Sequence, residues 1–180
     1  MSGRKILDAH KLDIILHRLA LELLENHKNP EQTAIIGLQP RGIIPAKRLH
    51  QHLCEITGNH QIPFGLLDIT FYRDDFRRSS KPLIPSSMEL NFSVEDKQVI
   101  LVDDVLYTGR SVRAALNALN DFGRPLKTEL LVLIDRRYSR ELPIEPNYVG
   151  EEVDSRANDK VEVKWKETHG EDEVWIITTD

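Results

Sequence analysis

The sequence predicts an α/β protein with a twisted, mostly parallel β-sheet flanked by helices. Three short apolar runs, at residues 33–38, 99–102 and 129–134, have the length and composition of strands buried on both faces of a sheet. The first two runs are each followed by a tight turn and a stretch with helical spacing. Repeated strand, turn and helix units imply a parallel sheet whose ligands bind at the carboxyl ends of the strands.

The first part of the chain supplies a helix, a strand and a second helix. Residues 8–27 place leucine and isoleucine side chains at helical spacing, with Asp8 as the N-cap. The strand at residues 33–38 runs into a turn rich in glycine and proline, and residues 45–56 resume the helical period. Residues 62–72 are expected to form a longer strand.

The second part begins with a stretch, up to about residue 94, that is rich in Arg, Asp, Ser and Pro and has no clear period. We expect a long mobile loop there. The strand at residues 99–102 and a helix at residues 108–122 form the second strand, turn and helix unit, closed by Gly123. Short segments of alternating polarity near the carboxyl terminus are expected to form a strand pair, at residues 161–165 and 174–177.

Composition limits the class of protein. A chain of 180 residues with 40% hydrophobic content can bury one sizeable core, so we expect residues 1–180 to form a single domain. The first residues lack the apolar core of a signal peptide, and no apolar run is long enough to cross a bilayer. The lone cysteine, Cys54, cannot form an internal disulfide. A cytoplasmic protein without membrane contact is therefore expected.

Charge is distributed unevenly along the chain. The formal net charge of -5 argues against a surface dedicated as a whole to nucleic acid. Arginines nevertheless concentrate in two places, one at Arg73, Arg77 and Arg78 and the other at Arg136, Arg137 and Arg140. Such clusters in loops favour a small anionic ligand, and a solvated charged surface is the alternative.

The most informative segment is residues 99–111, with the sequence VILVDDVLYTGRS. At the start of a helix, backbone N–H groups lack partners and the helix dipole is positive, so residues 107–111 can wrap a phosphate. Gly109 lets the backbone approach that phosphate closely. One turn earlier, the carboxylates of Asp103 and Asp104 would accept hydrogen bonds from vicinal hydroxyls of an attached sugar. A ribose 5-phosphate fits this arrangement.

An acidic pair after a buried strand also occurs in proteins of other function. Receiver domains hold a metal with such a pair, but they require further acidic and basic partners and have no use for a Thr-Gly-Arg-Ser phosphate loop. The segment also lacks the Gly-Lys-Ser/Thr ending of the Walker motif and the spaced glycines of the dinucleotide fingerprint. Nucleotide hydrolysis and hydride transfer therefore lose support.

The segment VILVDDVLYTGRS resembles the phosphoribosyl pyrophosphate signature of type I phosphoribosyltransferases. Four further segments resemble the PyrR family, whose members are pyrimidine operon regulators with uracil phosphoribosyltransferase activity. These segments are residues 40–42 (PRG), 67–75 (LDITFYRDD), 122–125 (FGRP) and 134–144 (IDRRYSRELPI). The resemblance runs from the first helix to about Gly150. It implies the type I phosphoribosyltransferase fold, in which a small hood and a mobile loop accompany the twisted sheet.

The resemblance also implies which residues bind phosphoribosyl pyrophosphate. The acidic pair, Asp103 and Asp104, would hold the ribose hydroxyls. The 5-phosphate would be bound by Tyr107, Thr108, Gly109, Arg110 and Ser111. The turn after the first strand would bind the diphosphate through Gln39, Pro40, Arg41 and Gly42.

The remaining implied site residues lie in two loops. The mobile loop would close over the diphosphate and bring Arg73 as a clamp, and Asp135 with Arg136 would form the base pocket. Family relatives usually have Thr where this turn has Gln39 and Pro40; because proline lowers the cost of a cis peptide, a cis bond between them is a hypothesis.

The resemblance predicts a uracil phosphoribosyltransferase of pyrimidine salvage, which converts uracil and phosphoribosyl pyrophosphate to UMP and pyrophosphate. The transition state is cation-like, so orientation of the base and stabilisation of the leaving group replace a nucleophilic triad. Mg²⁺ would arrive with the substrate, and no dedicated protein metal site is expected. Purine-salvage relatives have an aspartate where this chain has Tyr107, which favours a pyrimidine.

A regulator that senses UMP or phosphoribosyl pyrophosphate, binds RNA and attenuates transcription of pyrimidine genes, with weak or no enzyme activity, is the alternative. It requires basic side chains along a surface. The first helix offers Arg18 beside acidic residues, and Glu151 and Glu152 stand where regulatory relatives tend to be basic. We therefore favour the enzyme and expect a homodimer or a higher homo-oligomer, with RNA as a doubtful partner.

Overall fold

The computed structural model describes residues 2–72, 90–156 and 158–178, and it contains the predicted parallel sheet. Five strands pair side by side in the order β3-β2-β4-β5-β6, and every neighbouring pair is parallel. Their bounds are Phe64–Asp68 for β3, Thr33–Gln39 for β2, Gln98–Leu106 for β4, Lys127–Arg137 for β5 and Tyr148–Asp154 for β6. The parallel arrangement places all five carboxyl ends at the same edge of the sheet.

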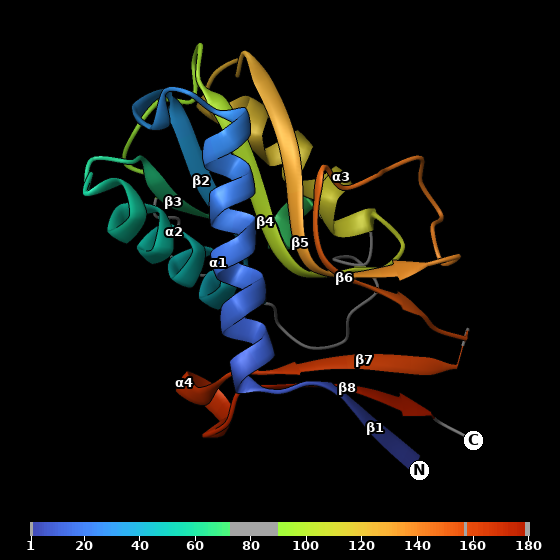
Figure 1. Ribbon diagram of the computed structural model, residues 1–180. Coiled ribbons are helices and arrows are strands. Elements are labelled where there is room, and N and C mark those ends of the chain that lie inside the picture. Colours follow the sequence, from blue (N-terminus) through green and yellow to red (C-terminus); the bar gives the residue numbers. More distant parts are fainter. Residues whose placement is uncertain (1, 73–89, 157, 179–180) are drawn as a thin grey trace.

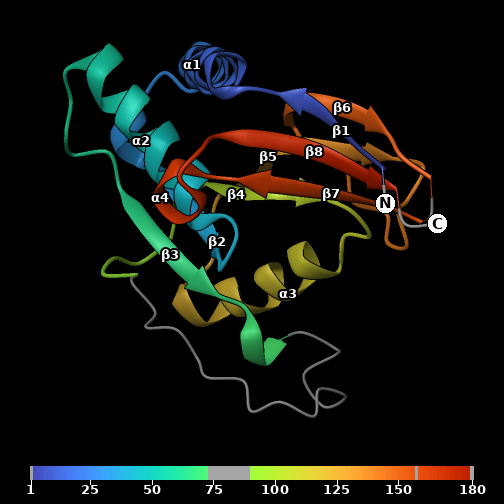
Figure 2. The same cartoon turned by 90° about the horizontal axis from the view of Figure 1, so that it is seen from below.

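Helices cover both faces of this sheet, as Figure 2 shows. α1 (Ala9–Asn26) and α2 (Ile43–Thr57) lie on one face, and α3 (Arg110–Leu119) lies on the other. Single 3-10 turns occur at η1 (Pro30–Gln32), η2 (Thr70–Tyr72) and η4 (Asn120–Phe122). The central strands are buried on both faces, which explains why they read as continuous apolar runs in the sequence.

Alternation along β4 divides the core into two clusters. Ile100 and Val102 pack in the cluster that contains α1 and α2, whereas Val99 and Leu101 pack in the cluster that contains α3. Successive side chains of a strand point to opposite faces, so residues 103 and 104, which follow in the same strand, also point to opposite faces.

A second, antiparallel sheet has the strand order β1-β8-β7. β1 (Ser2–Leu7), β7 (Asp159–Lys164), α4 (Lys166–His169) and β8 (Glu173–Thr178) form a unit that we call the hood. In Figure 1 the hood lies across one end of the central sheet, below α1. β8 is the middle strand, so the two ends of the chain meet in the hood.

Several expected elements differ from the observed ones. The strand expected at residues 62–72 ends at Asp68, whose carboxylate accepts a hydrogen bond from the Thr70 N–H at 2.8 Å and turns the chain into η2. The helix expected from residue 108 begins at Arg110, because Gly109 adopts a φ of 90° that a right-handed helix does not allow. The loop expected after β3 lies largely outside the described residues.

Other details match or extend the expectations. Asp8 caps α1 by accepting a hydrogen bond from the Lys11 N–H at 2.9 Å, and the Gln39–Pro40 peptide is cis, as hypothesised. β1 and β6 were not predicted. No helix in residues 2–72, 90–156 and 158–178 is long and apolar enough to cross a membrane.

Gly150 lets α1 pack closely over the sheet. A Cβ atom there would lie 2.3 Å from the Leu133 carbonyl oxygen and 2.8 Å from the Ile15 Cγ2 atom. The guanidinium of Arg18, on α1, also donates hydrogen bonds to the Val149 and Gly150 carbonyls, at 3.0 and 2.7 Å. The helix is therefore held directly against β6.

We predict that Gly150→Ala lowers the free energy of unfolding by about 3 kcal/mol, at the upper end of the cost of overpacking, because one neighbour of the added methyl is backbone. Gly170→Ala is the control: its φ is 84°, but a Cβ there meets nothing within 4 Å. Urea unfolding should show a cost of about 1 kcal/mol for the control. Equal costs for the two variants would contradict the close packing.

Candidate functional site

A cavity of about 460 Å³ opens at the carboxyl ends of β2 and β4. Its walls come from the turn after β2, the end of β4, the start of α3 and the hood. The sequence-predicted residues that line it are Gln39, Pro40, Arg41, Asp103, Asp104, Tyr107, Thr108, Gly109, Arg110, Ser111 and Arg136. The fold therefore brings together three segments that are far apart in the sequence.

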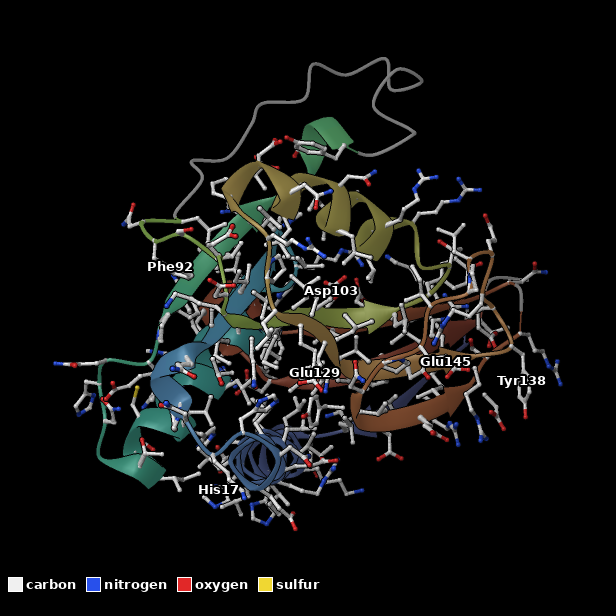
Figure 3. All side chains as sticks on the ribbon, turned by 90° about the horizontal axis from the view of Figure 1, so that it is seen from above. His17, Phe92, Asp103, Glu129, Tyr138 and Glu145 are labelled. Atoms are coloured by element: carbon white, nitrogen blue, oxygen red, sulfur yellow. The ribbon has the colours of Figure 1, made fainter. Side chains whose placement is uncertain are left out.

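The acidic pair is buried at the centre of this arrangement. Asp103 is 8% exposed and Asp104 is 6% exposed. The Asp103 Oδ1 atom accepts a hydrogen bond from the Asp104 N–H at 2.9 Å, and the Asp104 Oδ1 atom accepts one from the Val105 N–H at 2.7 Å. Figure 3 shows Asp103 in the interior, between the sheet and α3.

Burial sets the protonation of the pair. Removal from water raises the pKa of Asp103 well above its ordinary value, and the nearby charge of Asp104 raises it further. Burial also raises the pKa of Asp104, while the positive charge of Arg41 opposes that shift. Two carboxylates in this position are poised to bind a cationic or hydroxyl-rich ligand that replaces the lost water.

The phosphate-loop candidate, residues 107–111, is braced by a segment that follows β5. The Thr108 carbonyl accepts hydrogen bonds from the N–H groups of Glu141 and Leu142, at 3.1 and 3.2 Å. Gly109 packs so closely against this segment that a Cβ atom would lie 3.2 Å from the Ile144 side chain. Arg110 pairs with Glu141 at 2.5 Å. These contacts support the shape of the loop that opens α3.

The turn after β2 is equally constrained. The Gly42 N–H donates to the Leu38 carbonyl at 2.6 Å, and a Cβ atom at Gly42 would lie 2.2 Å from the Val102 carbonyl oxygen. Gly42 is buried and is not among the described residues that line the cavity; it lets the turn pack against β4. The adjacent Arg41 is exposed and lines the cavity.

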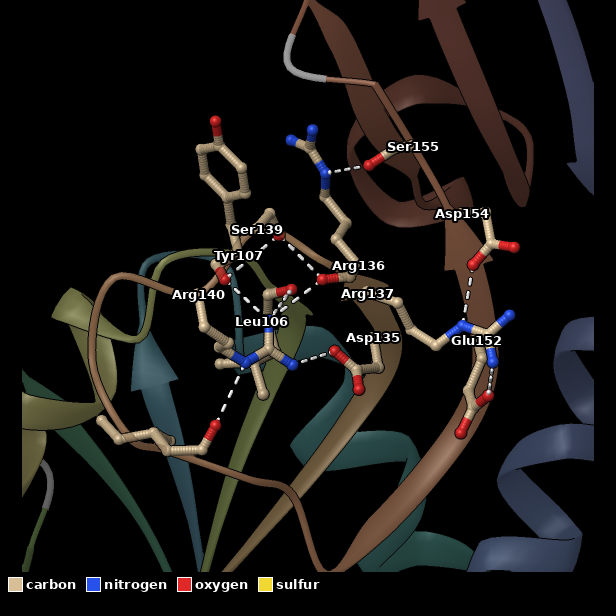
Figure 4. A network of polar contacts seen from close by, with 11 residues as sticks. Leu106, Tyr107, Asp135, Arg136, Arg137, Ser139, Arg140, Glu152, Asp154 and Ser155 are labelled. Atoms are coloured by element: carbon tan, nitrogen blue, oxygen red, sulfur yellow. Dashed lines mark hydrogen bonds and ion pairs between the residues drawn. The ribbon is translucent and has the colours of Figure 1, made fainter.

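Arg136, near the end of β5, joins that strand to the hood; Figure 4 shows its hydrogen bond to Ser155, which lies between β6 and β7. Its guanidinium donates to the Ser155 hydroxyl at 2.9 Å and to the Asp159 carbonyl at 2.8 Å. The same guanidinium lies over the Tyr107 ring, 4.0 Å from the ring centroid. Burial lowers the pKa of Arg136 from its ordinary value. Because the end of β5 and the hood share this side chain, they form one wall of the cavity.

Asp135 occupies a different position from Arg136, the next residue in the chain. It is buried, its carboxylate pairs with the Arg140 guanidinium, and it is not among the described residues that line the cavity. Arg140 also donates to the Tyr107 carbonyl at 2.6 Å and to the Ile144 carbonyl at 3.1 Å. Asp135 therefore supports the loop around the cavity. Arg73, the expected clamp, lies outside the described residues.

Sequence analysis missed the contribution of the hood. Lys160 and Val161 of β7 line the same cavity as the acidic pair. They also line a smaller cavity of about 260 Å³, which continues past Pro40 and Arg41 between α2 and the hood. The alternating pattern of residues 161–165 indicated a strand, but no local signal shows which distant residues a strand of a second sheet will face.

Comparisons with known proteins identify the family of this chain. Residues 2–168 match the phosphoribosyl transferase domain family. The chain is 47% identical over 173 residues to the bifunctional protein PyrR of Desulfosudis oleivorans, an alignment that covers 96% of this chain and 95% of the relative. The chain belongs to the PyrR family of phosphoribosyltransferases. It is also 47% identical to the bifunctional protein PyrR of Deinococcus radiodurans, over 96% of this chain and 93% of the relative.

Solved structures support the fold of this phosphoribosyltransferase. The hypoxanthine phosphoribosyltransferase of Trypanosoma cruzi superposes with a TM-score of 0.70, over 98% of this chain and 97% of that one, at 15% identity. A hypoxanthine phosphoribosyltransferase of Staphylococcus aureus superposes with the same TM-score, over 98% of this chain and 92% of that one, at 18% identity. At such identity the likeness concerns the fold alone. The type I phosphoribosyltransferase fold expected from the sequence is confirmed.

We predict that Asp103→Asn raises the free energy of unfolding, and raises it more at pH 8 than at pH 5. The folded-state pKa of Asp103 is raised, so the wild type loses stability as pH rises from the unfolded-state pKa of about 4 through the folded-state pKa. Asparagine keeps the hydrogen-bond acceptor and removes the buried charge.

Urea unfolding at several pH values measures this effect. Asp154→Asn is the matched control, because the Asp154 side chain is 62% exposed and pairs with Arg137 at the surface. We expect no pH-dependent gain from the control. A loss of stability in Asp103→Asn at pH 8 would show that the ionised carboxylate is better solvated than its burial indicates.

Proposed function

We propose that this phosphoribosyltransferase joins uracil to phosphoribosyl pyrophosphate and releases UMP and pyrophosphate, with residues 1–180 acting as a single domain. The observation that carries the proposal is the buried acidic pair, Asp103 and Asp104, in the same cavity as the loop at residues 107–111. Kinship with the PyrR family supports uracil as the base.

The sugar phosphate half of the substrate is assigned to the α3 side. Backbone N–H groups at the start of α3 and the hydroxyls of Thr108 and Ser111 would bind the 5-phosphate. Asp103 and Asp104 would accept hydrogen bonds from the ribose hydroxyls. Carboxylates accept hydrogen bonds from uncharged hydroxyl groups, so the acidic pair is suited to a sugar whose phosphate is bound nearby by other groups.

The diphosphate half is assigned to the turn after β2. Arg41 would meet the diphosphate oxygens, with Gln39, Pro40 and Gly42 shaping the turn, and Arg73 is proposed as a second cation. Mg²⁺ fits this donor set, because two carboxylates lie beside a position for phosphate oxygens. Held by the substrate and the acidic pair, it would neutralise charge on the leaving group. The described residues contain no cluster of three or more His, Cys, Asp or Glu side chains that could hold a metal alone.

The base is assigned to the wall made by Tyr107, Arg136 and the hood. Tyr107 has no carboxylate to offer a purine nitrogen, and its ring is already stacked beneath the Arg136 guanidinium. We propose that Arg136 directs the base and that Asp135 acts on the same pocket through Arg140. Backbone groups near residues 136–139 would then recognise the uracil carbonyl and imide groups.

Catalysis in this proposal consists of positioning. A bond forms between N1 of uracil and the anomeric carbon, the bond from that carbon to the diphosphate oxygen breaks, and the N1 proton is released. Positive charge develops on the ribose, and the buried carboxylates of Asp103 and Asp104 favour it electrostatically. Arg41 stabilises the opposite charge on the leaving group. The hood excludes water from the anomeric carbon, which prevents hydrolysis.

We predict pyrophosphate release from phosphoribosyl pyrophosphate and Mg²⁺ with uracil, and not with orotate, hypoxanthine or guanine. Asp104→Asn should lower kcat/KM for uracil by about 100-fold, because it removes charge from the position where the transition state becomes positive. A coupled assay for pyrophosphate, with each base side by side, measures both.

Lys5→Gln is the control for this assay. Lys5 lies in the hood, 44% exposed, and pairs with Glu173 away from both cavities, so kcat/KM should stay unchanged. Turnover with a purine base alone would contradict the assignment of the base. Binding of phosphoribosyl pyrophosphate or UMP without turnover on any base would move the protein to the regulatory class.

One observation favours a second function, RNA-dependent regulation: the relatives carry the name bifunctional protein PyrR. Several arginines on the described surface already bind protein groups and are less available to bind RNA phosphates. Arg18 binds the β6 backbone, Arg110 pairs with Glu141, and Arg137 pairs with Glu152 and Asp154. The enzyme remains the main proposal, because the charge pattern supports RNA binding less than the cavity supports catalysis.

A further inference from the structure

The hood is fastened to the rest of the protein by an arginine near each of its ends. Arg136 holds the segment between β6 and β7, as described above. At the other end, Arg48 of α2 binds two hood carboxylates at once. Its guanidinium lies 3.0 and 2.7 Å from the two Glu167 oxygens, and 2.9 and 2.7 Å from the two Asp172 oxygens.

The Arg48 cluster includes an aromatic side chain. The Arg48 guanidinium lies over the Trp165 ring, 4.7 Å from the centroid, and Trp165 is only 3% exposed. Asp172 also accepts a hydrogen bond from the Lys166 N–H at 2.7 Å, which fixes the start of α4. Because the planar guanidinium binds two carboxylates and stacks on an indole ring, it sets the positions of Glu167, Asp172 and Trp165.

This cluster borders the smaller cavity. Trp165, Thr168 and His169 line that cavity from the hood, and Pro40 and Arg41 line it from the turn after β2. The Trp165 Nε1 atom is buried and has no hydrogen-bond partner among the described residues. The Trp165 ring therefore contributes to the cavity wall, while its N–H group is covered by protein atoms.

Arg48 is also connected to the diphosphate turn through a rigid element. α2 begins at Ile43, directly after the turn, and Arg48 lies within its first two turns. Figure 2 shows α4 beside the start of α2. The turn that carries Arg41 and the hood wall that faces it are therefore tied together by one helix and one side chain. By contrast, Tyr107 and Arg136 line only the larger cavity.

We propose that Arg48 is a positioning residue: through Trp165, Glu167 and Asp172 it sets the distance between the hood and the turn at Arg41, and so shapes the site for the diphosphate half of the substrate. The inference rests on the proposed phosphoribosyl transfer. Arg48 itself touches neither the base nor the ribose site, because it lines neither cavity. Arg48 is linked to the turn at Arg41 through α2, whereas Arg136 holds the other end of the hood separately, so we expect substitution of Arg48 to affect the diphosphate side more than the base side.

Steady-state kinetics with each substrate varied separately tests the selectivity. Arg48→Lys keeps the charge but cannot bind both carboxylates as a planar fork, and Arg48→Gln removes the charge. For both variants we expect KM for phosphoribosyl pyrophosphate to rise by about tenfold, the order of effect of a small misplacement, and KM for uracil to change by less than about twofold. Lys5→Gln, which breaks a different ion pair of the hood, should change neither value.

A binding measurement separates this inference from the proposed function. In a Trp175→Phe background, Trp165 is the remaining tryptophan, and its emission reports on the smaller cavity. Titration with magnesium pyrophosphate should change that emission, and Arg48→Lys should raise the Kd for pyrophosphate by about tenfold. This readout does not require turnover, so it remains informative if no base is a substrate.

Three outcomes would overturn the inference. The first is an equal rise of both KM values, and the second is an unchanged Kd for pyrophosphate in Arg48→Lys. The third is a drop in thermal stability with unchanged kinetics, which would make the cluster purely structural. If Arg48→Gln fails to fold, Glu167→Gln serves instead, since the Glu167 side chain is 49% exposed and its loss leaves the Asp172 pair intact. It should produce a smaller change in the same direction.

Discussion

The burial of two adjacent carboxylates at the end of β4 is the constraint on which the site depends. Asp103 and Asp104 follow four apolar residues of a central strand, and alternation sends them to opposite faces. Water is largely excluded from both, which costs stability unless other groups compensate. Backbone N–H groups of residues 104 and 105 and the charge of Arg41 compensate in part. In the proposed function, a ligand with hydroxyls and a cation supplies the rest.

The two-faced arrangement of the acids explains why the site has two halves. Asp103 lines the larger cavity on the α3 side, where the start of α3 can bind a phosphate, whereas Asp104 also lines the smaller cavity near α2. The hood spans both halves, and the arginines at its two ends belong to different segments of the core. In the proposed function, one strand end therefore positions the sugar, and the surrounding elements bind the phosphate, the leaving group and the base.

Much of this architecture follows from local sequence. The runs at residues 33–38, 99–102 and 129–134 are buried on both faces, so their strands could be recognised without knowledge of their partners. Residues 99–111 also contain the acidic pair and the candidate phosphate loop within one short segment, at the end of one strand and the start of the next helix. The sequence therefore predicted a group of candidate residues that the fold places in one cavity, and their binding of a sugar phosphate stays a prediction.

The elements and contacts that could not be predicted from the sequence depend on residues that lie far apart along the chain. In β6 the adjacent Glu151 and Glu152 are both exposed, which breaks the alternation of polarity, and β1 is largely polar, so neither shows the apolar pattern of a strand. Arg48 and Asp172 stand 124 residues apart, and nothing local indicates that they meet. Asp135 and Arg136 are adjacent in sequence, yet only Arg136 lines the cavity, because the pairing of Asp135 with Arg140 turns that carboxylate to the loop.

A crystal structure of the protein with UMP tests the central claim most directly. The account predicts a phosphate held by the backbone of residues 107–111, ribose hydroxyls against Asp103 and Asp104, and the uracil ring beside Arg136 and the hood. UMP bound with its phosphate at the turn that carries Arg41, or outside the larger cavity, would contradict the account and would leave the buried acids without the role assigned to them.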